Sequence, residues 1–243
     1  MKKAKNGKLI EECNEEYFSK INSKDKAWVL GFLYADGYIS KSLSSLQIRL
    51  SLKDKEVLEK IKDFISFEGS VKEYISKCKN KEYPSCFLII NSCKLVQDLN
   101  KLGCTHKKSL TLTFPNFLDE NYYSHFIRGY FDGDGSISYR ETKNEAKINI
   151  KGTESFLLSL SNILKNKEMT TSFYKQKEAN VFNLELCGYN NVLKFINYIY
   201  KESNDKIRMI RKVEKARHIN NVINNNRKIK LRKNIIYETI NIK

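Results

Sequence analysis

Two segments of the sequence, 29–37 and 127–135, repeat one pattern in which an apolar run contains small residues and ends in Asp-Gly. The small residues stand four positions apart in each run, Gly31 with Ala35 and Gly129 with Gly133. At that spacing they share one face of an α-helix, where they let a second backbone approach closely. The sequence therefore predicts two helices that pack directly against each other.

Both helices are expected to end at the repeated Asp-Gly. We predict that Gly37 and Gly135 adopt the left-handed conformation that ends many helices, which puts Asp36 and Asp134 in the last turns. A carboxylate there faces the negative end of the helix dipole, at a cost of about 0.3–1 kcal/mol, and a divalent cation between the two carboxylates would reverse that sign. Ordinary glycine caps with solvated aspartates are the alternative, which the recurrence in matching context disfavours.

The composition indicates a partner with many negative charges. The 243 residues include 44 Lys and Arg against 28 Asp and Glu, a formal net charge of +16, which makes nucleic acid the first candidate. We expect no membrane partner, because no apolar run approaches the roughly 18–20 residues that a spanning helix needs. The six cysteines lack any Cys-x-x-Cys spacing, which favours reduced thiols and an intracellular protein, in a cytoplasm, a nucleoid or an organelle.

The same order of elements is expected after each Asp-Gly. Segment 45–52 alternates polar and apolar residues like a strand with one solvated face, and 53–65 has the pattern of an amphipathic helix. The first copy continues with a hairpin of 71–77 and 86–91, a helix over 94–102 and an extended segment over 107–114. The second copy predicts a strand over 147–151, a helix over 154–164, a hairpin of 171–176 and 181–187, and a helix over 191–200.

Equivalent positions of the two copies keep a nearly constant spacing. Asp36 and Asp134 are 98 positions apart, whereas the spacing is 100 for Ile48 with Ile148 and 95 for Phe87 with Phe182. This indicates the duplication of a unit of about a hundred residues. The predicted fold is α+β, with two αββαββα units and antiparallel sheets, related by a pseudo-twofold axis between the glycine-bearing helices at the interface.

The chain is expected to have four parts. They are an N-terminal extension (1–23), a first unit (24–118), a second unit (119–217) and a basic C-terminal tail (218–243). We expect the extension to pack on the first unit. The tail would either add nonspecific phosphate contacts or be disordered.

These motifs resemble those of the LAGLIDADG homing endonucleases, specifically the members with two motifs in one chain. The resemblance rests on Leu-Gly-Phe-Leu-Tyr-Ala-Asp-Gly at 30–37, Phe-Asp-Gly-Asp-Gly-Ser at 131–136 and the duplication around them, and it extends over 24–217. It implies that the sheets form a DNA-binding saddle, and that both strands of a long DNA site are cut with a divalent metal. Tyr34 departs from the pattern where the second motif has Asp132, at a position that is not a metal ligand in the family.

The resemblance also implies a metal site. Asp36 and Asp134 would hold Mg²⁺, for which Mn²⁺ would substitute, with help from the carbonyls of Ala35 and Gly133. Mg²⁺ prefers oxygen ligands and keeps several waters, so phosphates of the cut DNA would complete its coordination. The family pattern places a polar strand residue and a basic residue beside the metal, which selects as further catalytic candidates Arg49, Asn149, Lys108 and Lys206.

The polar faces of the two sheets are expected to contact DNA, because a ribbon of strands fits the major groove. The candidates in the first unit are Ser40, Gln47, Arg49, Ser51, Lys72 and Tyr74. The candidates in the second unit are Ser138, Arg140, Lys147, Asn149, Lys151, Lys175 and Lys177. Lys and Arg would give most of the affinity through phosphates, and the amide side chains Gln47 and Asn149 would read base edges.

The sequence thus predicts a monomeric, Mg²⁺-dependent, site-specific endonuclease that hydrolyses one phosphodiester in each strand of double-stranded DNA. Two alternatives use the same fold: an RNA-binding group I intron maturase, whose partner would be intron RNA, and a noncatalytic DNA-binding regulator. The pair Asp36 and Asp134 favours the nuclease, because neither binding role needs converging carboxylates beside phosphates.

Overall fold

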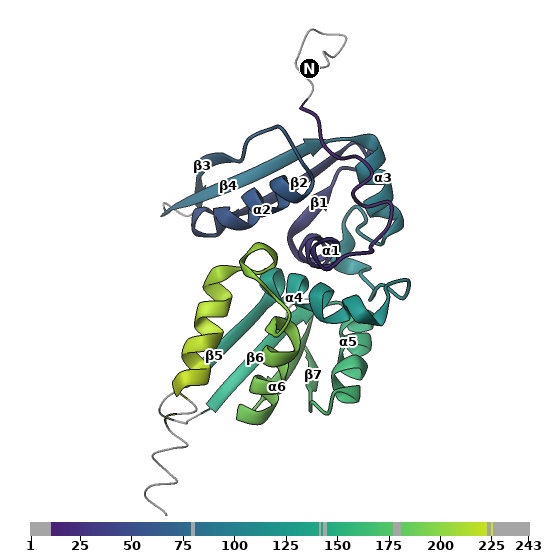
Figure 1. The fold of residues 1–243 in the computed structure, drawn as a ribbon. Helices are drawn as coiled ribbons and strands as arrows, with labels where there is room; N and C mark the ends of the chain where they lie inside the picture. Colours follow the sequence, from purple (N-terminus) through teal and green to yellow (C-terminus); the bar gives the residue numbers. More distant parts are fainter. Residues whose placement is uncertain are drawn as a thin grey trace, which may run out of the picture.

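The computed structural model describes residues 11–78, 81–140, 142, 145–176, 181–222 and 225. Two units stack on each other, each with a four-stranded antiparallel sheet and its own helices (Figure 1). Within those residues, no helix combines the length and the apolar character needed to cross a bilayer.

The first unit has the predicted order αββαββα. Its elements are α1 (Lys24–Asp36), β1 (Gly37–Ile39), β2 (Ser45–Ser51), α2 (Lys55–Phe64), β3 (Lys72–Cys78), β4 (Lys81–Asn91) and α3 (Cys93–Lys101). Two 3-10 turns complete it, η1 (Leu52–Asp54) between β2 and α2, and η2 (Lys108–Leu110) after α3. The strands pair in the order β1-β2-β4-β3.

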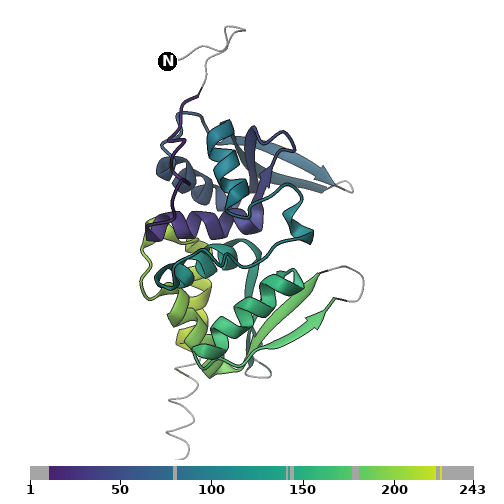
Figure 2. The ribbon, with the colours of Figure 1, turned by 90° about the vertical axis from the view of Figure 1, so that its right-hand side faces the viewer.

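The second unit repeats this order. Its elements are α4 (Tyr123–Asp134), β5 (Gly135–Arg140), β6 (Glu145–Gly152), α5 (Glu154–Asn166), β7 (Ser172–Lys175), β8 (Phe182–Cys187) and α6 (Tyr189–Tyr200), with η3 (Glu120–Tyr122) before α4 and η5 (Asp205–Ile207) after α6. A further helix is described over 210–222. The strand order β5-β6-β8-β7 matches that of the first unit, which confirms the duplicated α+β fold. Hairpins β3–β4 and β7–β8 project to the same side of the molecule (Figure 2).

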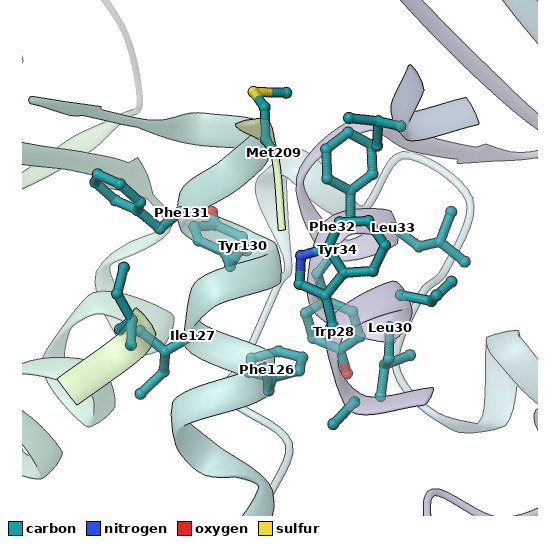
Figure 3. Packing of buried hydrophobic residues seen from close by; sticks show 14 of the residues in the cluster. Trp28, Leu30, Phe32, Leu33, Tyr34, Phe126, Ile127, Tyr130, Phe131 and Met209 are labelled. Carbon is teal, nitrogen blue, oxygen red and sulfur yellow. The ribbon is translucent and has the colours of Figure 1, made fainter. Parts of the chain in front are cut away.

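Helices α1 and α4 pack backbone to backbone between the units. A Cβ placed on Gly31 would lie 2.0 Å from the Phe126 carbonyl oxygen, and one on Gly129 would lie 2.0 Å from the Trp28 carbonyl oxygen. The two contacts correspond at an offset of 98 positions, as a pseudo-twofold axis between the helices requires. The predicted direct packing is confirmed. Aromatic side chains of both helices gather beside the contact (Figure 3), among them Trp28, Phe32, Tyr34, Phe126 and Tyr130.

The two helix-ending glycines differ from the prediction. Gly37 (φ −74°, ψ 138°) and Gly135 (φ −83°, ψ 156°) are extended, so the left-handed conformation was wrong. Glycine is needed there for space, because a Cβ on Gly37 would lie 2.6 Å from the Leu33 carbonyl oxygen and one on Gly135 would lie 2.0 Å from a ring carbon of Phe131. Each helix turns directly into a strand, and the two aspartates are the last helical residues, as predicted.

Of the segments outside the repeated elements, the N-terminal extension agrees with the prediction and the segment 107–114 does not. The described part of the extension packs on the first unit as expected: Tyr17 and Phe18 are buried, and the Asn14 N–H donates to the Ile65 carbonyl oxygen (2.7 Å). The segment 107–114, predicted to be extended, instead forms η2 after a left-handed Lys107 (φ 57°). The predicted tail lies outside the described residues except for 218–222 and 225.

Strand pairing changes which residues of the two copies are equivalent. Gly37 pairs with Ile48 and Gly135 pairs with Ile150, so Ile150 matches Ile48, and the predicted match with Ile148 was wrong. The cause is a longer hairpin between β5 and β6 than between β1 and β2.

The same shift continues into the next strands. Arg49 pairs with Phe87, and Lys151 pairs with Asn183. Phe87 therefore matches Asn183 rather than Phe182, and Arg49 matches Lys151.

Asp132, the other acid of the second motif, has a structural role. Its buried carboxylate accepts hydrogen bonds from Trp28 Nε1 (2.9 Å), the Tyr200 hydroxyl (3.0 Å) and the Met209 N–H (3.0 Å). It joins α1 of the first unit to two segments of the second. Tyr34, at the equivalent position of α1, donates its hydroxyl to a backbone carbonyl of its own unit.

We expect Asp132→Ala to lower the free energy of unfolding by roughly 2–4 kcal/mol, because three buried donors would lose their acceptor. Chemical denaturation of the variant and the wild type measures the difference. Asp63→Ala, at an exposed position of α2, is the control. A loss for Asp132→Ala no larger than that of the control would contradict this role.

Candidate active site and nucleic-acid interface

Asp36 and Asp134 end the two packed helices close to the pseudo-twofold axis. A Cβ placed on Gly133 would lie 2.3 Å from the Ala35 Cβ and 2.8 Å from Asp36 Oδ2, so the Asp36 carboxylate lies against the last turn of α4. Asp36 is half-buried and Asp134 is exposed. The structure thus places together the two carboxylates that the repeated motif singled out.

The surroundings disfavour ionisation of both acids. Desolvation and the charge of Asp134 raise the pKa of Asp36 to about 6. Desolvation also raises the pKa of Asp134, against the opposing charges of Lys108 and Lys212. Two like charges in a partly desolvated site are costly unless a cation compensates them. Carboxylates and backbone carbonyls are the hard oxygen donors that Mg²⁺ prefers, so the donor set fits this ion.

Any such ion would need ligands beyond side chains. Across the described ranges, no group of three or more His, Cys, Asp or Glu side chains is placed to hold a metal ion. The two carboxylates would therefore be completed by backbone carbonyls, water and oxygen atoms of a substrate.

Two lysines reach the ends of the same helices, one from each unit. Both Lys108 and Lys212 are only 7% exposed. Their Nζ atoms donate to backbone carbonyls, those of Ala35 (3.3 Å) and Gly37 for Lys108, and those of Phe131, Gly133 (3.3 Å) and Gly135 (2.7 Å) for Lys212. The carbonyls of Ala35 and Gly133 are among those that a helix end leaves without an intrahelical partner, and each ammonium opposes the negative end of the helix dipole. Desolvation lowers the pKa of Lys212 to about 8.

Lys212, and not the predicted Lys206, is the counterpart of Lys108. Lys206 is exposed in η5, where its backbone N–H donates to Asn204 Oδ1 (3.0 Å). The structure does not bring it to the carboxylates. The Arg211-Lys212 pair, which the resemblance indicates as part of the run that closes the second unit, lies in the first turn of the helix over 210–222 and is the sequence signal for this position.

The raised pKa of Asp36 predicts that Asp36→Asn stabilises the metal-free protein at neutral pH. The folded-state pKa of about 6 lies above the unfolded value of 3.8, so ionisation costs the folded state free energy as pH rises through this interval. The gain of the variant should be complete above about pH 6, on the order of 1–3 kcal/mol, and absent below about pH 4. Denaturation in EDTA at pH 4 and pH 7.5 measures it, and a pH-independent difference would contradict the assignment.

Most of the predicted DNA-contact residues of the first unit share one face of its sheet. The cross-strand pairs on this face are Gln47 with Ile89, Arg49 with Phe87, Phe87 with Lys72, Ser51 with Ser85, and Ser85 with Tyr74. Asp36, Tyr38, Gln47 and Arg49 line one cavity, so the face continues to the carboxylates. Ser40 is different, because its Oγ accepts the N–H groups of two later serines in the turn between β1 and β2.

The corresponding face of the second sheet contains both signs of charge. Predicted residues on it are Ser138, Arg140, Lys147, Asn149 and Lys151. Glu185, which was not among the predicted residues, also lies on this face. Its carboxylate accepts hydrogen bonds from Asn149 Nδ2 (3.1 Å), the Tyr174 hydroxyl (2.8 Å) and Lys147 Nζ (3.1 Å). Although desolvation opposes them, these hydrogen bonds lower the pKa of Glu185. Glu185 thereby fixes the side chains of two predicted residues, Lys147 and Asn149, and of the neighbouring Tyr174.

One predicted contact of the second unit, Lys175, is not on this face. Lys175 pairs with Phe182, which pairs with Gly152, so it lies on the opposite face, with Nζ 5.9 Å from the centre of the Phe182 ring. The prediction for Lys175 was wrong, because the register of β7 could not be counted from alternation alone. Lys177 lies outside the described residues.

Register also corrects the predicted pair of polar residues beside the carboxylates. Gln47 pairs with Tyr38, two residues after Asp36, and Asn149 pairs with Ser136, two residues after Asp134. Gln47 is therefore the counterpart of Asn149. The prediction that Arg49 is the counterpart of Asn149 was wrong.

A family model of the LAGLIDADG-like domain matches residues 23–103 and 121–200, most of both units. The probable translation initiation factor IF-2 of Methanocaldococcus jannaschii is 25% identical over 219 residues, which cover 80% of this chain and 17% of that protein. The intron-encoded RNA maturase bI4 of Saccharomyces cerevisiae is 28% identical over 152 residues, which cover 56% of this chain and 22% of that protein. The chain thus spans less than a quarter of either relative.

Solved structures share the fold at low sequence identity. The homing endonuclease I-WcaI bound to its DNA recognition sequence has a TM-score of 0.60 at 14% identity, covering 82% of this chain and 91% of that one. I-GzeII in complex with its DNA target has a TM-score of 0.56 at 14% identity, covering 87% and 92%. Full-length DUF199/WhiA from Thermatoga maritima has a TM-score of 0.52 at 17% identity, covering 94% and 72%. The fold alone does not choose between a nuclease and another role.

Proposed function

The chain belongs to the LAGLIDADG family, and on this premise we propose that it is a metal-dependent endonuclease that cuts both strands of a long, specific DNA site. The observation that supports this most is the convergence of Asp36 and Asp134, one from each unit, at the ends of two packed helices. Their pKa values are raised, and a buried lysine lies beside each helix end. A module that only bound nucleic acid would gain nothing from carboxylates that repel phosphates.

The chemistry to be performed is hydrolysis of a phosphodiester. Water adds to phosphorus and loses a proton, one P–O ester bond breaks, and the leaving oxygen takes up a proton. Bound Mg²⁺, with Mn²⁺ as a substitute, would supply Lewis acidity and an activated water. Asp36 and Asp134 would hold the ion, and the carbonyls of Ala35 and Gly133 retain a second lone pair beyond the one that faces a lysine.

The protein's own side chains would orient the reactants. The ammonium groups of Lys108 and Lys212 place positive charge beside the carboxylates, where they would attract the backbone of the DNA. Gln47 and Asn149, the register-equivalent amides, would hydrogen-bond water or phosphate on either side of the axis. Arg49, in the same cavity as Asp36, would bind phosphate.

The symmetry of the fold suits duplex DNA. The two backbones of a duplex are related by local twofold axes, so each unit would meet one strand and one half of the site. Because one chain contains both units, a monomer would suffice. The basic sheet residues would supply salt-dependent affinity, and amide side chains on the same faces would discriminate bases.

A second candidate is an RNA-binding role in intron splicing, favoured by the similarity to the maturase bI4. The basic surfaces would serve either nucleic acid, so affinity alone does not separate the two functions. A noncatalytic DNA-binding regulator is the third candidate.

The test is a direct comparison of DNA and RNA as substrates. The full chain is incubated with a mixed-sequence duplex DNA pool in Mg²⁺, in Ca²⁺ and in EDTA, and with a panel of group I intron RNAs as competitors. Double-strand breaks in Mg²⁺ alone are the expected result. Tight RNA binding without any DNA break would transfer the proposal to a maturase, and tight DNA binding without a break would transfer it to a regulator.

A further inference from the structure

The segment that contains Lys212 is docked on the first unit. After α6 the chain crosses the interface and passes beside α2 (Figure 1). There Lys60 Nζ donates to the Arg208 carbonyl oxygen (2.8 Å), and the Ile210 N–H donates to Glu56 Oε1 (2.8 Å). Both partners belong to α2, more than a hundred positions away in the sequence.

A two-pronged ion pair adds to these contacts. Arg211 Nε donates to Asp54 Oδ1 (2.8 Å), and Arg211 Nη2 donates to Asp54 Oδ2 (3.0 Å). Asp54 is only 7% exposed. A guanidinium that meets a carboxylate in this way fixes direction as well as distance, so the pair sets the backbone from which the neighbouring Lys212 extends.

Asp54 is also attached to the surface proposed to contact DNA. It is the last residue of η1, which directly follows β2, and the outward face of β2 contains Arg49 and Ser51. Asp54 therefore connects β2, a strand of the first unit proposed to face DNA, with the segment of the second unit that contains Lys212.

The second unit has the same arrangement at the equivalent place. Thr153 directly follows β6 and is the N-cap of α5, as Asp54 is of α2. Its Oγ1 donates to the carbonyl oxygen of Leu112, in the segment that contains Lys108. The segment that contains Lys108 is thus held by the second unit through a neutral hydrogen bond, and the segment that contains Lys212 is held by the first unit through an ion pair.

We propose that Asp54 and Thr153 are positioning residues. Each would link DNA bound on the sheet of its own unit to the position of the lysine in the other unit: Asp54 to Lys212, and Thr153 to Lys108. This inference rests on the proposed function and deepens it. By the pseudo-twofold symmetry, each lysine would serve the cut in one strand. Because the contact at Asp54 is charged and two-pronged, the cut that uses Lys212 would depend on its contact more than the cut that uses Lys108. The two strands therefore respond differently when one contact is removed.

The test compares Asp54→Asn and Thr153→Val with a matched control. Asp98→Asn is the control, because Asp98 is also 7% exposed and ion-paired, with lysines of its own helix α3. Duplex target labelled on either strand gives the cutting rate of each strand. Asp54→Asn should change the ratio of the two rates by about tenfold or more, so that nicked DNA accumulates. Thr153→Val should shift the ratio the opposite way by a smaller factor, and Asp98→Asn should not shift it.

A second readout needs neither DNA nor metal. Acetylation of lysines, followed by mass spectrometry, should find Lys212 protected in the wild type and in Asp98→Asn but modified in Asp54→Asn. Arg211→Lys, which keeps the charge but loses the fork, should give an intermediate result and serves if Asp54→Asn does not fold. Equal slowing of both strands, or continued protection of Lys212, would overturn the inference. If the wild type cuts no DNA, the proposed function fails, and acetylation still decides whether the contact positions the lysine.

Discussion

Asp36→Asn and Asp134→Asn are each expected to reduce DNA cleavage by a factor on the order of 10³ or more. The substitution keeps the shape of the side chain and removes the charge that would hold the metal. DNA affinity in EDTA should be unchanged or higher, because a carboxylate that repels phosphate is lost. Single-turnover cleavage of the target and an equilibrium binding titration measure the two effects on the same preparations.

The contrast between the two measurements excludes a trivial loss of folding. Asp63→Asn, at an exposed position of α2, is the matched control and should cut like the wild type. Cleavage at the wild-type rate by either active-site variant would contradict the assigned site. Loss of binding together with cleavage would indicate a structural role for the aspartate instead.

Gly31→Ala and Gly129→Ala should destabilise the protein by about 1–3 kcal/mol or more each. Each added methyl would lie 2.0 Å from a carbonyl oxygen of the facing helix, and backbone cannot move away without separating α1 from α4. The sign of the change in stability is decisive, because Gly→Ala in a helix without a close neighbour stabilises a protein by about 0.5–1 kcal/mol.

Chemical denaturation of the two glycine variants measures this effect, with Ser155→Ala in an exposed turn of α5 as the control. Cleavage should fall as well, since separated helices no longer hold Asp36 against the end of α4. A stabilised variant would contradict the close approach of the two backbones.

Local pattern predicted the elements well and the matching of the two copies poorly. Alternation and helical spacing located the strands and helices, and the paired Gly31 and Gly129 located the interface, because each of these signals depends on near neighbours. Equivalence across the duplication depends on insertions that no local pattern reveals. Lys206 follows Asp134 by 72 positions, as Lys108 follows Asp36, yet the longer second unit makes Lys212, at 78 positions, the counterpart.

Contacts that depend on the three-dimensional arrangement could not be predicted from local sequence patterns either. Gly37 was predicted to be left-handed because its type favours that conformation, whereas the crowding by Leu33 that requires a glycine appears only in three dimensions. Glu185 was overlooked as one acid among basic residues, and only the register of β8 places it against Asn149.

Cutting of both strands of one long site at the pseudo-twofold axis is best examined by sequencing the ends released from a randomised duplex library. In Mg²⁺ we expect paired breaks, one in each strand at a fixed offset, within a single long motif, and in Ca²⁺ we expect no breaks. Tight binding of the library without breaks, or breaks without a common motif, would contradict this expectation.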